Sequence, residues 1–435
     1  MNRSLKKLTL ALVITLGTCG TAMATAEEAK QPPLPLDDLR TFAEVFERIK
    51  GAYVEPIADD VLLENAIKGM LSGLDPHSAY LDPKAFEHLQ VNTSGEFGGL
   101  GIEVGMEEGL LRVITPIDDT PAQRAGVLPG DRIIKLDQKS LQGVELMEAV
   151  NRMRGEAGSE IELTILREGE PQPIDLVLTR AVIKVTSVKS KLLDNNFGYL
   201  RISQFQVHTG QDLTKAIEKL KQQQALSGLI LDLRNNPGGV LQAAVDVSDA
   251  FIDQGLIVYT KGRIQQAELR YSATEETSAG KLPLVVLINS GSASASEIVA
   301  GALQDHKRGV VMGSPSFGKG SVQTVLPLTN DRALKLTTAR YFTPNGRSIQ
   351  AEGIIPDIRV EPSKVTKLES RNRVKEADLA RHLDNGDEGT DDKKENKAPG
   401  RSKADKALLG SDYQLNEAVN LLKALSIMAN NETAG

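Results

Sequence analysis

A serine, a lysine and a glutamine occupy positions that suit hydrolytic chemistry. Ser294 lies in the run G-S-A-S-A-S-E-I, just after an apolar segment, Leu284 to Asn289, that is typical of a buried strand. A hydroxyl at a strand-to-helix turn is a common position for a nucleophile. Lys319 follows in F-G-K-G-S-V-Q, which ends at Gln323. These residue types predict hydrolysis by a serine nucleophile with a lysine as its base.

A lysine base needs a lowered pKa, because free lysine has a pKa of ~10.4 and is protonated at neutral pH. Burial between Phe317 and Val322, away from carboxylates, is the expected cause. Gln323 can orient the amine without holding it protonated, as a carboxylate would. A straight strand would separate Lys319 from Gln323 by ~13 Å, so we predict a turn between them.

A second loop is expected at the same edge of the sheet. L-D-L-R-N-N-P-G-G ends another predicted strand, and its Gly238-Gly239 backbone can approach a ligand closely. Ligands of open α/β sheets bind at the carboxyl ends of the strands. The amides of this loop are therefore predicted to form an oxyanion site beside Ser294.

Three other interpretations compete with this one. Ser294 to Glu297 spells S-x-x-E, so the serine could simply cap a helix. A Ser-His-Asp triad is disfavoured, because His306 would lie about three turns along the same helix, ~18 Å from Ser294. G-S-P-S-F-G-K-G nearly matches a phosphate-binding loop, but Gly320 stands where the magnesium-binding hydroxyl is required.

The surrounding pattern predicts a multidomain α/β + β protein. Residues 25–97 form a helical N-terminal region, with helices expected over 36–53 and 61–71, turns after them and a linker of uncertain structure at its end. Short alternating strands with one helix make residues 98–180 a small β-rich module. Strands and helices alternate over residues 181–362, which predicts an α/β domain with a largely parallel sheet.

The two ends of the chain differ from the rest in composition. Residues 1–24 combine a basic start, a short apolar run and an A-x-A site, which predicts a signal peptide and a periplasmic protein. The only cysteine, Cys19, lies inside this segment, and a lipid anchor there is a minor alternative. Residues 363–410 are predicted to be a charged, partly disordered linker. Residues 411–435 predict an amphipathic helix that docks on its own core or on another subunit.

Charge and composition restrict the partners. The formal net charge of −7 becomes more negative when the basic signal segment is removed, which argues against nucleic acid. Removal of that segment also leaves no cysteine for disulfides, zinc-thiolate sites or a cysteine nucleophile. The sequence has no clustered metal ligands, so we expect neither a metal nor a cofactor.

Five blocks in order give the chain a family resemblance. They are L-D-P-H-S-A-Y, G-L-G-I with L-P-G-D-R-I, L-D-L-R-N-N-P-G-G, S-A-S-A-S-E and F-G-K-G-S-V-Q. With them the chain resembles the C-terminal processing peptidases, or tail-specific serine proteases. The resemblance implies a crotonase-like catalytic domain with Ser294 as nucleophile, Lys319 as base and Gln323 in support. The oxyanion donors that it implies are the amides of Ala295 and of Gly238 or Gly239.

The β-rich module is similar to a PDZ domain. This similarity implies that its G-G-L-G-I loop exposes amides to a terminal carboxylate, and that the strand Ile102 to Val104 pairs with the peptide. The peptide-binding residues implied are Gly99, Leu100, Gly101, Ile102, Met147 and Val150. For the last two, a simple core role is an equally open alternative.

The resemblance implies an endopeptidase that cleaves near the C-terminal tails of unfolded or partly unfolded extracytoplasmic proteins. Its partners would be polypeptides with exposed C-termini, and an activating or adaptor protein is left open. We also expect a homo-oligomer formed through the N- and C-terminal helices. The alternatives are a catalytically silent PDZ-type scaffold that only binds peptides, and an esterase or other acyl hydrolase on the same framework.

Overall fold

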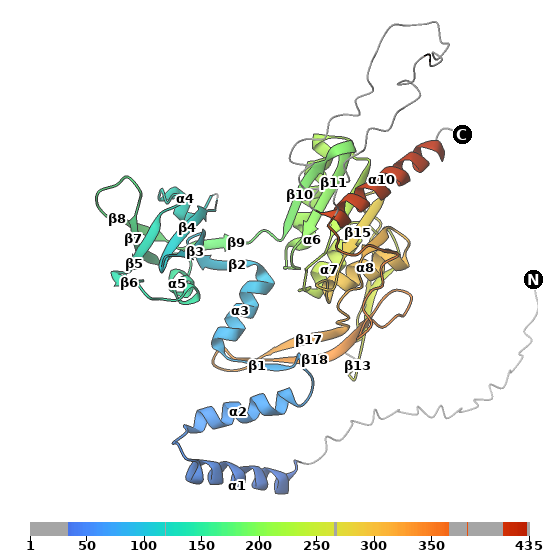
Figure 1. The fold of residues 1–435 in the computed structure, drawn as a ribbon. Helices are drawn as coiled ribbons and strands as arrows, with labels where there is room; N and C mark the ends of the chain where they lie inside the picture. Colours follow the sequence, from blue (N-terminus) through green and yellow to red (C-terminus); the bar gives the residue numbers. More distant parts are fainter. Residues whose placement is uncertain (1–33, 118, 265–267, 365–380, 382–411, 433–435) are drawn as a thin grey trace, which may run out of the picture. The chain divides into compact units, whose positions relative to one another are not determined.

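The computed structural model describes residues 34–117, 119–264, 268–364, 381 and 412–432 (Figure 1). The signal segment with Cys19, and nearly all of the predicted linker, lie outside these residues. The chain divides into two units, Met1–Ile67 and Lys68–Gly435. Within the described part, no helix has both the length and the apolar character needed to cross a membrane.

The first unit contains α1 (Leu36–Ala52) and the start of α2 (Asp59–Ser72), close to the predicted helices. An ion pair between the Lys50 ammonium and the Asp59 carboxylate, 2.9 Å apart, joins the two helices. No residue of α1 is buried, and its apolar side chains stay largely exposed.

The segment after α2 is more regular than the sequence suggested. β1 (Ala79–Leu81) pairs antiparallel with β18 (Ala333–Phe342), where turns were predicted. α3 (Pro83–Ser94) occupies most of the stretch that was expected to be a linker. Its start is capped by Asp82, whose side chain accepts from the Ala85 N–H at 2.8 Å. The short polar cap and Pro83 at the first position explain the helix.

Within the second unit, Asp75 joins the segment before β1 to β18. Its carboxylate accepts from the Ser78 hydroxyl at 2.6 Å and from the Thr337 hydroxyl of β18 at 3.1 Å. The hydrogen bond from Ser78 is the main reason that the pKa of Asp75 falls to about 2. Part of the L-D-P-H-S-A-Y block therefore serves as an anchor for β1.

The predicted β-rich module has its own sheet and core. Its strands are β3 (Ile102–Glu107), β4 (Leu110–Pro116), β5 (Arg132–Leu136), β6 (Lys139–Ser140), β7 (Glu160–Leu166) and β8 (Ile174–Thr179). Its helices are α4 (Pro121–Arg124) and α5 (Leu146–Met153). The sheet order is β3-β4-β5-β7-β8, with β6 on β5, so β3 is an edge strand. A two-stranded ribbon, β2 (Glu96–Gly99) with β9 (Ala181–Lys184), flanks the module in sequence.

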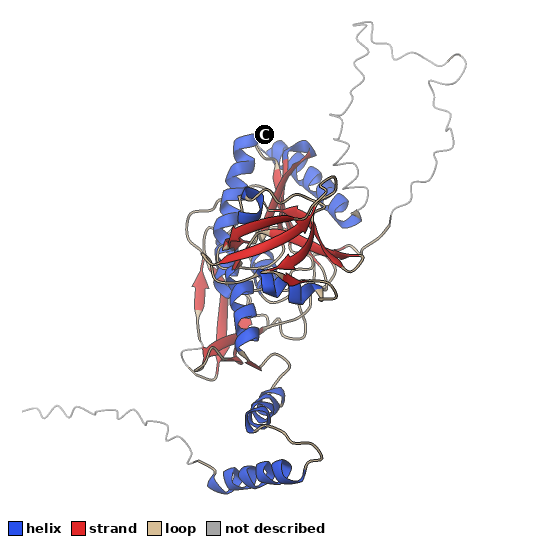
Figure 2. Cartoon of the chain, turned by 90° about the vertical axis from the view of Figure 1, so that its left-hand side faces the viewer, coloured by secondary structure: helices blue, strands red, loops and turns tan. Residues whose placement is uncertain are grey.

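The α/β part is built on a six-stranded sheet. Its strands, in spatial order, are β10 (Val188–Leu193), β11 (Phe197–Ile202), β12 (Gly228–Asp232), β15 (Leu284–Ile288), β16 (Val310–Gly313) and β19 (Ile358–Arg359). All neighbours are parallel except β10 and β11. The helices α6 (Thr209–Gln223), α7 (Leu241–Asp249) and α8 (Ala295–Asp305) share one buried core with this sheet (Figure 2).

A second, antiparallel sheet supplies the other wall of the α/β part. Its order is β1-β18-β13-β14, with β17 also paired to β18. The further strands are β13 (Leu256–Gly262), β14 (Arg270–Ser272) and β17 (Ser321–Pro327). The segment of β13 was expected in the parallel sheet and instead lies here.

The terminal helix α10 (Tyr413–Glu432) covers the opposite face of the six-stranded sheet. Leu415, Val419 and Leu422 are buried there against residues such as Ile230 and Leu287. Arg234 fixes the start of the helix, because its guanidinium donates two hydrogen bonds to Asp412 at 2.7 and 2.9 Å. Of the two predicted docking modes, the structure has the intramolecular one, so this apolar face is not free for another subunit. The predicted oligomer stays a prediction.

Candidate active site

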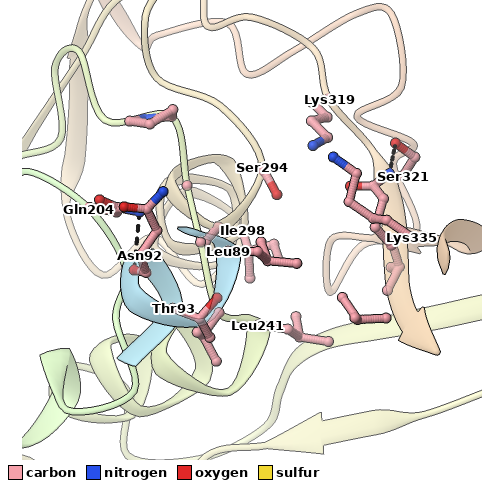
Figure 3. A pocket seen from close by; sticks show the side chains of 18 of the residues that line it. Leu89, Asn92, Thr93, Gln204, Leu241, Ser294, Ile298, Lys319, Ser321 and Lys335 are labelled. Carbon is pink, nitrogen blue, oxygen red and sulfur yellow. Dashed lines mark hydrogen bonds between the residues drawn. The ribbon is translucent and has the colours of Figure 1, made fainter. Parts of the chain in front are cut away.

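A cavity of about 490 Å³ gathers the residues singled out from the sequence. Its walls come from α3, from the loop after β12, from the start of α8 and from β17 and β18 (Figure 3). The lining includes every predicted reaction residue: Ser294, Lys319, Gln323, Ala295, Gly238 and Gly239. Residues that are far apart in the chain thus meet at the carboxyl ends of β12 and β15.

Ser294 is held in a backbone conformation that side chains rarely adopt. Its φ of 55° and ψ of −113° lie outside the helical and extended regions, directly before α8. The neighbouring hydroxyls are buried and bonded to carbonyls: Ser292 donates to Leu233 at 2.8 Å and Ser296 to Asn236 at 2.9 Å. Ser294 instead is half-buried and lines the cavity. Strain of this kind is typical of functional positions.

The capping interpretation accounts for only part of this geometry. Ser294 does occupy the N-cap of α8, and its N–H donates to the Glu297 carboxylate at 2.7 Å. The two residues form the S-x-x-E capping box, and the N–H of Glu297 also donates to the backbone oxygen of Ser294 at 2.8 Å. An ordinary N-cap also has extended φ and ψ angles. Capping therefore leaves the strained turn unexplained.

Glu297 connects the turn that carries Ser294 to the loop that carries Lys319. Its side chain is fully buried, and both of its oxygens accept two hydrogen bonds. One oxygen accepts from the N–H groups of Ser294 and Lys319, at 2.7 and 2.9 Å. The other accepts from the Gly318 N–H and the Ser316 hydroxyl, both at 2.6 Å. From the S-x-x-E pattern, Glu297 was expected only to cap a helix, and that pattern does not indicate its contacts with residues 316 to 319.

The electrostatic surroundings of Lys319 differ from those expected. Burial lowers the pKa of Lys319, as predicted, and the charge of Lys335 lowers it further. Phe317 is not the cause, because it is 64% exposed. Nor is the amine remote from carboxylates, since Asp75 and Glu297 act to raise its pKa.

The predicted turn between Lys319 and Gln323 is wrong. β17 begins at Ser321, and pairing with β18 satisfies its backbone without a turn. A register shift follows Val322, and both Val322 and Gln323 line the cavity although consecutive strand residues usually face opposite ways. The Gln323 amide donates to the Ser321 hydroxyl at 2.9 Å and lies 3.4 Å from that of Thr337.

Two residues of β18 that line the cavity were not predicted from the sequence. Lys335 lines the cavity beside Lys319, and Figure 3 shows both amines directed toward the space next to the Ser294 hydroxyl. Tyr341 is almost fully buried in the same wall, and burial raises the pKa of its phenol. The alternating pattern of residues 333–342 is typical of a strand, but it does not indicate which sheet the strand joins.

The glycine loop after β12 presents one amide of the predicted pair. The Gly238 N–H donates to the Asn236 side chain at 2.9 Å, so it is already engaged. The N–H groups of Gly239 and Ala295 have no hydrogen-bond acceptor within the described residues. Both residues line the cavity with Ser294. The conformation favours Gly239 over Gly238 as a donor to a bound group.

Comparison with known proteins shows which family the chain belongs to. Residues 196–360 match the model of peptidase family S41, residues 98–178 that of a PDZ domain, and residues 18–85 that of the N-terminal domain of the activating protease CtpB. A carboxy-terminal-processing protease of Bartonella bacilliformis is 48% identical over 389 residues, which cover 88% of each chain. The chain belongs to the carboxy-terminal processing proteases. They are serine-type peptidases of family S41.

Other members of this protease family are also similar. The carboxy-terminal processing protease CtpA of Bacillus subtilis is 38% identical over 74% of this chain and 69% of its own length. A solved photosystem II D1 C-terminal processing protease is 32% identical, covers 74% of this chain and 92% of its own, and has a TM-score of 0.44. In the described residues of this processing protease, no group of three His, Cys, Asp or Glu side chains is placed to hold a metal ion.

The PDZ domain of this processing protease has a separate groove of about 220 Å³. Of the residues implied in peptide binding, Gly99, Leu100, Gly101, Ile102 and Val150 line it. Met147 does not, and it is 58% exposed; Met153, one turn further along α5 than Val150, takes the place expected for it. The unpaired edge of β3 borders the groove, so it is open to an added strand.

Replacing Gly239 by alanine in this protease should weaken both folding and activity. The new Cβ would lie 2.0 Å from the backbone oxygen of Phe205, at a φ of +146°. We expect a loss of roughly 2 kcal/mol in unfolding free energy and about tenfold in kcat/KM, because the loop must move. Gly280→Ala is the matched control, since its φ is also positive but its Cβ meets open space. Equal effects in denaturant titrations of the two variants would contradict the steric argument.

Proposed function

We propose that this protease cleaves near the C-terminal tails of unfolded extracytoplasmic polypeptides with a Ser294–Lys319 dyad. The observation that carries the proposal is the single cavity in which Ser294, Lys319 and two unbonded backbone amides meet. Gln323 lies in the same wall and supports the dyad through the polar groups around it. We further infer that the six-stranded sheet and its helices form a crotonase-like framework.

The proposed reaction is amide hydrolysis in two steps. The Lys319 amine takes the proton of the Ser294 hydroxyl as the Ser294 oxygen attacks the scissile carbonyl carbon. The N–H groups of Gly239 and Ala295 stabilise the oxyanion that forms on the carbonyl oxygen. The lysine ammonium then protonates the leaving amine, and the C–N bond breaks. The same amine then deprotonates a water molecule as its oxygen attacks the acyl carbon. The ammonium returns the proton to the Ser294 oxygen as the ester bond breaks and the carboxylic acid product leaves.

The PDZ groove is the proposed receptor for the tail. A free carboxylate would bind the loop at Gly99 to Gly101, and the peptide would add to the open edge of β3. The groove is lined mainly by apolar side chains, so an apolar last residue is favoured. We propose periplasmic localisation from the signal segment, polypeptide substrates, and a homo-oligomer in which an adaptor protein can take part.

Two peptides of the same sequence test this function. Each is an internally quenched, unstructured peptide with an apolar C-terminal residue; one ends in a free carboxylate and the other in an amide. We expect cleavage of both, with kcat/KM at least about tenfold higher for the free carboxylate because only it can bind the loop amides.

The other outcomes separate the alternatives. Binding without cleavage of either peptide would support the silent scaffold, and the proposed proteolysis would then be wrong. Equal cleavage of both peptides would contradict recognition of the free C-terminal carboxylate but would still support peptidase activity. Hydrolysis of a matched ester with no hydrolysis of the peptides would favour an esterase.

A further inference from the structure

Lys335 lies on β18 at a position that the backbone fixes from two sides. It is opposite Val325 of β17 and opposite Ala79 of β1, so its strand is paired along both edges. Two residues further on, Thr337 is opposite Gln323 and bonds to Asp75. The side chain of Lys335 is half-buried and lines the cavity that contains Ser294 and Lys319.

Within the described residues, the Lys335 ammonium has no counter-ion. It takes part there in no hydrogen bond and no ion pair, although the side chain is half-buried. The two carboxylates near the dyad are committed elsewhere. Asp75 accepts from Ser78, Thr337 and two backbone N–H groups, and Glu297 accepts four hydrogen bonds of its own.

Each element around the dyad contributes to the local charge. β18 supplies Lys335 and the neutral phenol of Tyr341, and α8 supplies Glu297. The segment before β1 supplies Asp75 and His77, and burial together with the charge of Lys319 lowers the pKa of His77. His77 is therefore neutral near pH 7, and Lys335 is the one unpaired cation beside Lys319 within the described residues.

We propose that Lys335 is a positioning residue for the base: its unpaired ammonium, carried on a strand that is paired along both edges, disfavours a second positive charge on Lys319 and so keeps that amine neutral. The inference deepens the proposed function, because it rests on Lys319 acting as the base. A neighbouring cation is an established way to activate a lysine, alongside burial. Here burial and the second cation oppose the attraction of Asp75 and Glu297, which favours the protonated, inactive form.

The pH dependence of cleavage by Lys335→Met tests the proposal. Without the second ammonium, the pKa of Lys319 rises, so less of the amine is neutral at pH 7. We expect roughly a tenfold lower kcat/KM at pH 7, with the acid limb of the pH profile moved to higher pH and the parent rate recovered at alkaline pH. Lys335→Arg keeps the charge and should retain the parent profile. Lys189→Met, an exposed lysine on β10, is the control for losing a lysine.

A higher KM for Lys335→Met at an unmoved acid limb would overturn the proposal, because Lys335 would then contact the substrate instead. A purely structural role is also separable, since it would lower activity equally at all pH values and would not be rescued by arginine.

A second measurement does not depend on proteolysis. The full-length protein is labelled with a trace of acetic anhydride, which reacts only with neutral amines, over a series of pH values. Mass spectrometry of the peptide that contains Lys319 then gives the neutral fraction of that lysine at each pH. Lys319 in Lys335→Met should become reactive only at higher pH than in the parent protein. Superimposed labelling curves would overturn the inference even if the enzyme is active. If the labelling curve of Lys335→Met is shifted but the parent protein cleaves neither peptide, the coupling between the two lysines stands and the proposed peptidase function is refuted.

Discussion

Ser294→Ala should lower kcat/KM by roughly 10⁴-fold while leaving the fold intact. The side chain is half-buried at the wall of the cavity, so removal of its oxygen opens no enclosed void. The backbone contacts of the turn, through the Glu297 carboxylate, do not need the hydroxyl. Steady-state cleavage of the free-carboxylate peptide, together with a thermal unfolding midpoint, measures both consequences.

The two flanking serines of the same run are matched controls. Ser292 and Ser296 are fully buried, and each donates to a carbonyl in the loop after β12. Each carbonyl keeps a second donor, the Asn236 N–H at Leu233 and the Ala293 N–H at Asn236. Alanine at either position therefore removes one buried hydrogen bond, at a cost of about 0.5–1.5 kcal/mol in unfolding free energy. These variants should lose stability yet keep most of their activity per folded molecule. Full activity in Ser294→Ala, or its loss only in the flanking variants, would contradict Ser294 as nucleophile.

Much of the site could be predicted because its residues lie at the ends of strands and helices that have clear patterns in the local sequence. The apolar run before Ser294 and the small residues around it required a strand followed by a sharp turn, and the structure has β15 and α8 there. The two glycines after β12 were expected to let the backbone approach a ligand closely. Their φ angles are positive, and both positions are in tight contact with other segments of the chain.

Long-range pairing explains what could not be predicted. Lys319 and Gln323 seemed to need a turn, because spacing along one strand was the only available measure of distance. The structure instead has a register shift in the β17–β18 pair, which depends on a partner strand. Lys335 is an unremarkable lysine in an alternating strand until β18 is placed beside β17 and β1. The stretch that forms α3 was uncertain because its apolar residues are few and none is buried.

Glu297→Gln should be the most damaging substitution outside the dyad. The carboxylate offers acceptors to two donors on each oxygen, whereas an amide carries an oxygen on one side only. In either orientation, the amide NH₂ group faces two donors in a site that is closed to water. We expect a loss of about 3 kcal/mol in unfolding free energy. A second loss, of roughly 10²-fold in kcat, follows if the Ser294 turn and the Lys319 loop separate by even a fraction of an ångström.

Two measurements separate the loss of stability in Glu297→Gln from its effect on catalysis. Chemical denaturation gives the stability of Glu297→Gln, and kinetics at a temperature where the variant is fully folded give kcat apart from that loss. Glu352→Gln, an exposed glutamate in the same domain, controls for removal of a negative charge. Glu297 bonds only to backbone N–H groups and one hydroxyl, and its charge also acts to raise the pKa of Lys319, so its removal changes both the geometry of the dyad and the charge near the base. A folded Glu297→Gln enzyme with the parent kcat would show that the dyad does not depend on this link.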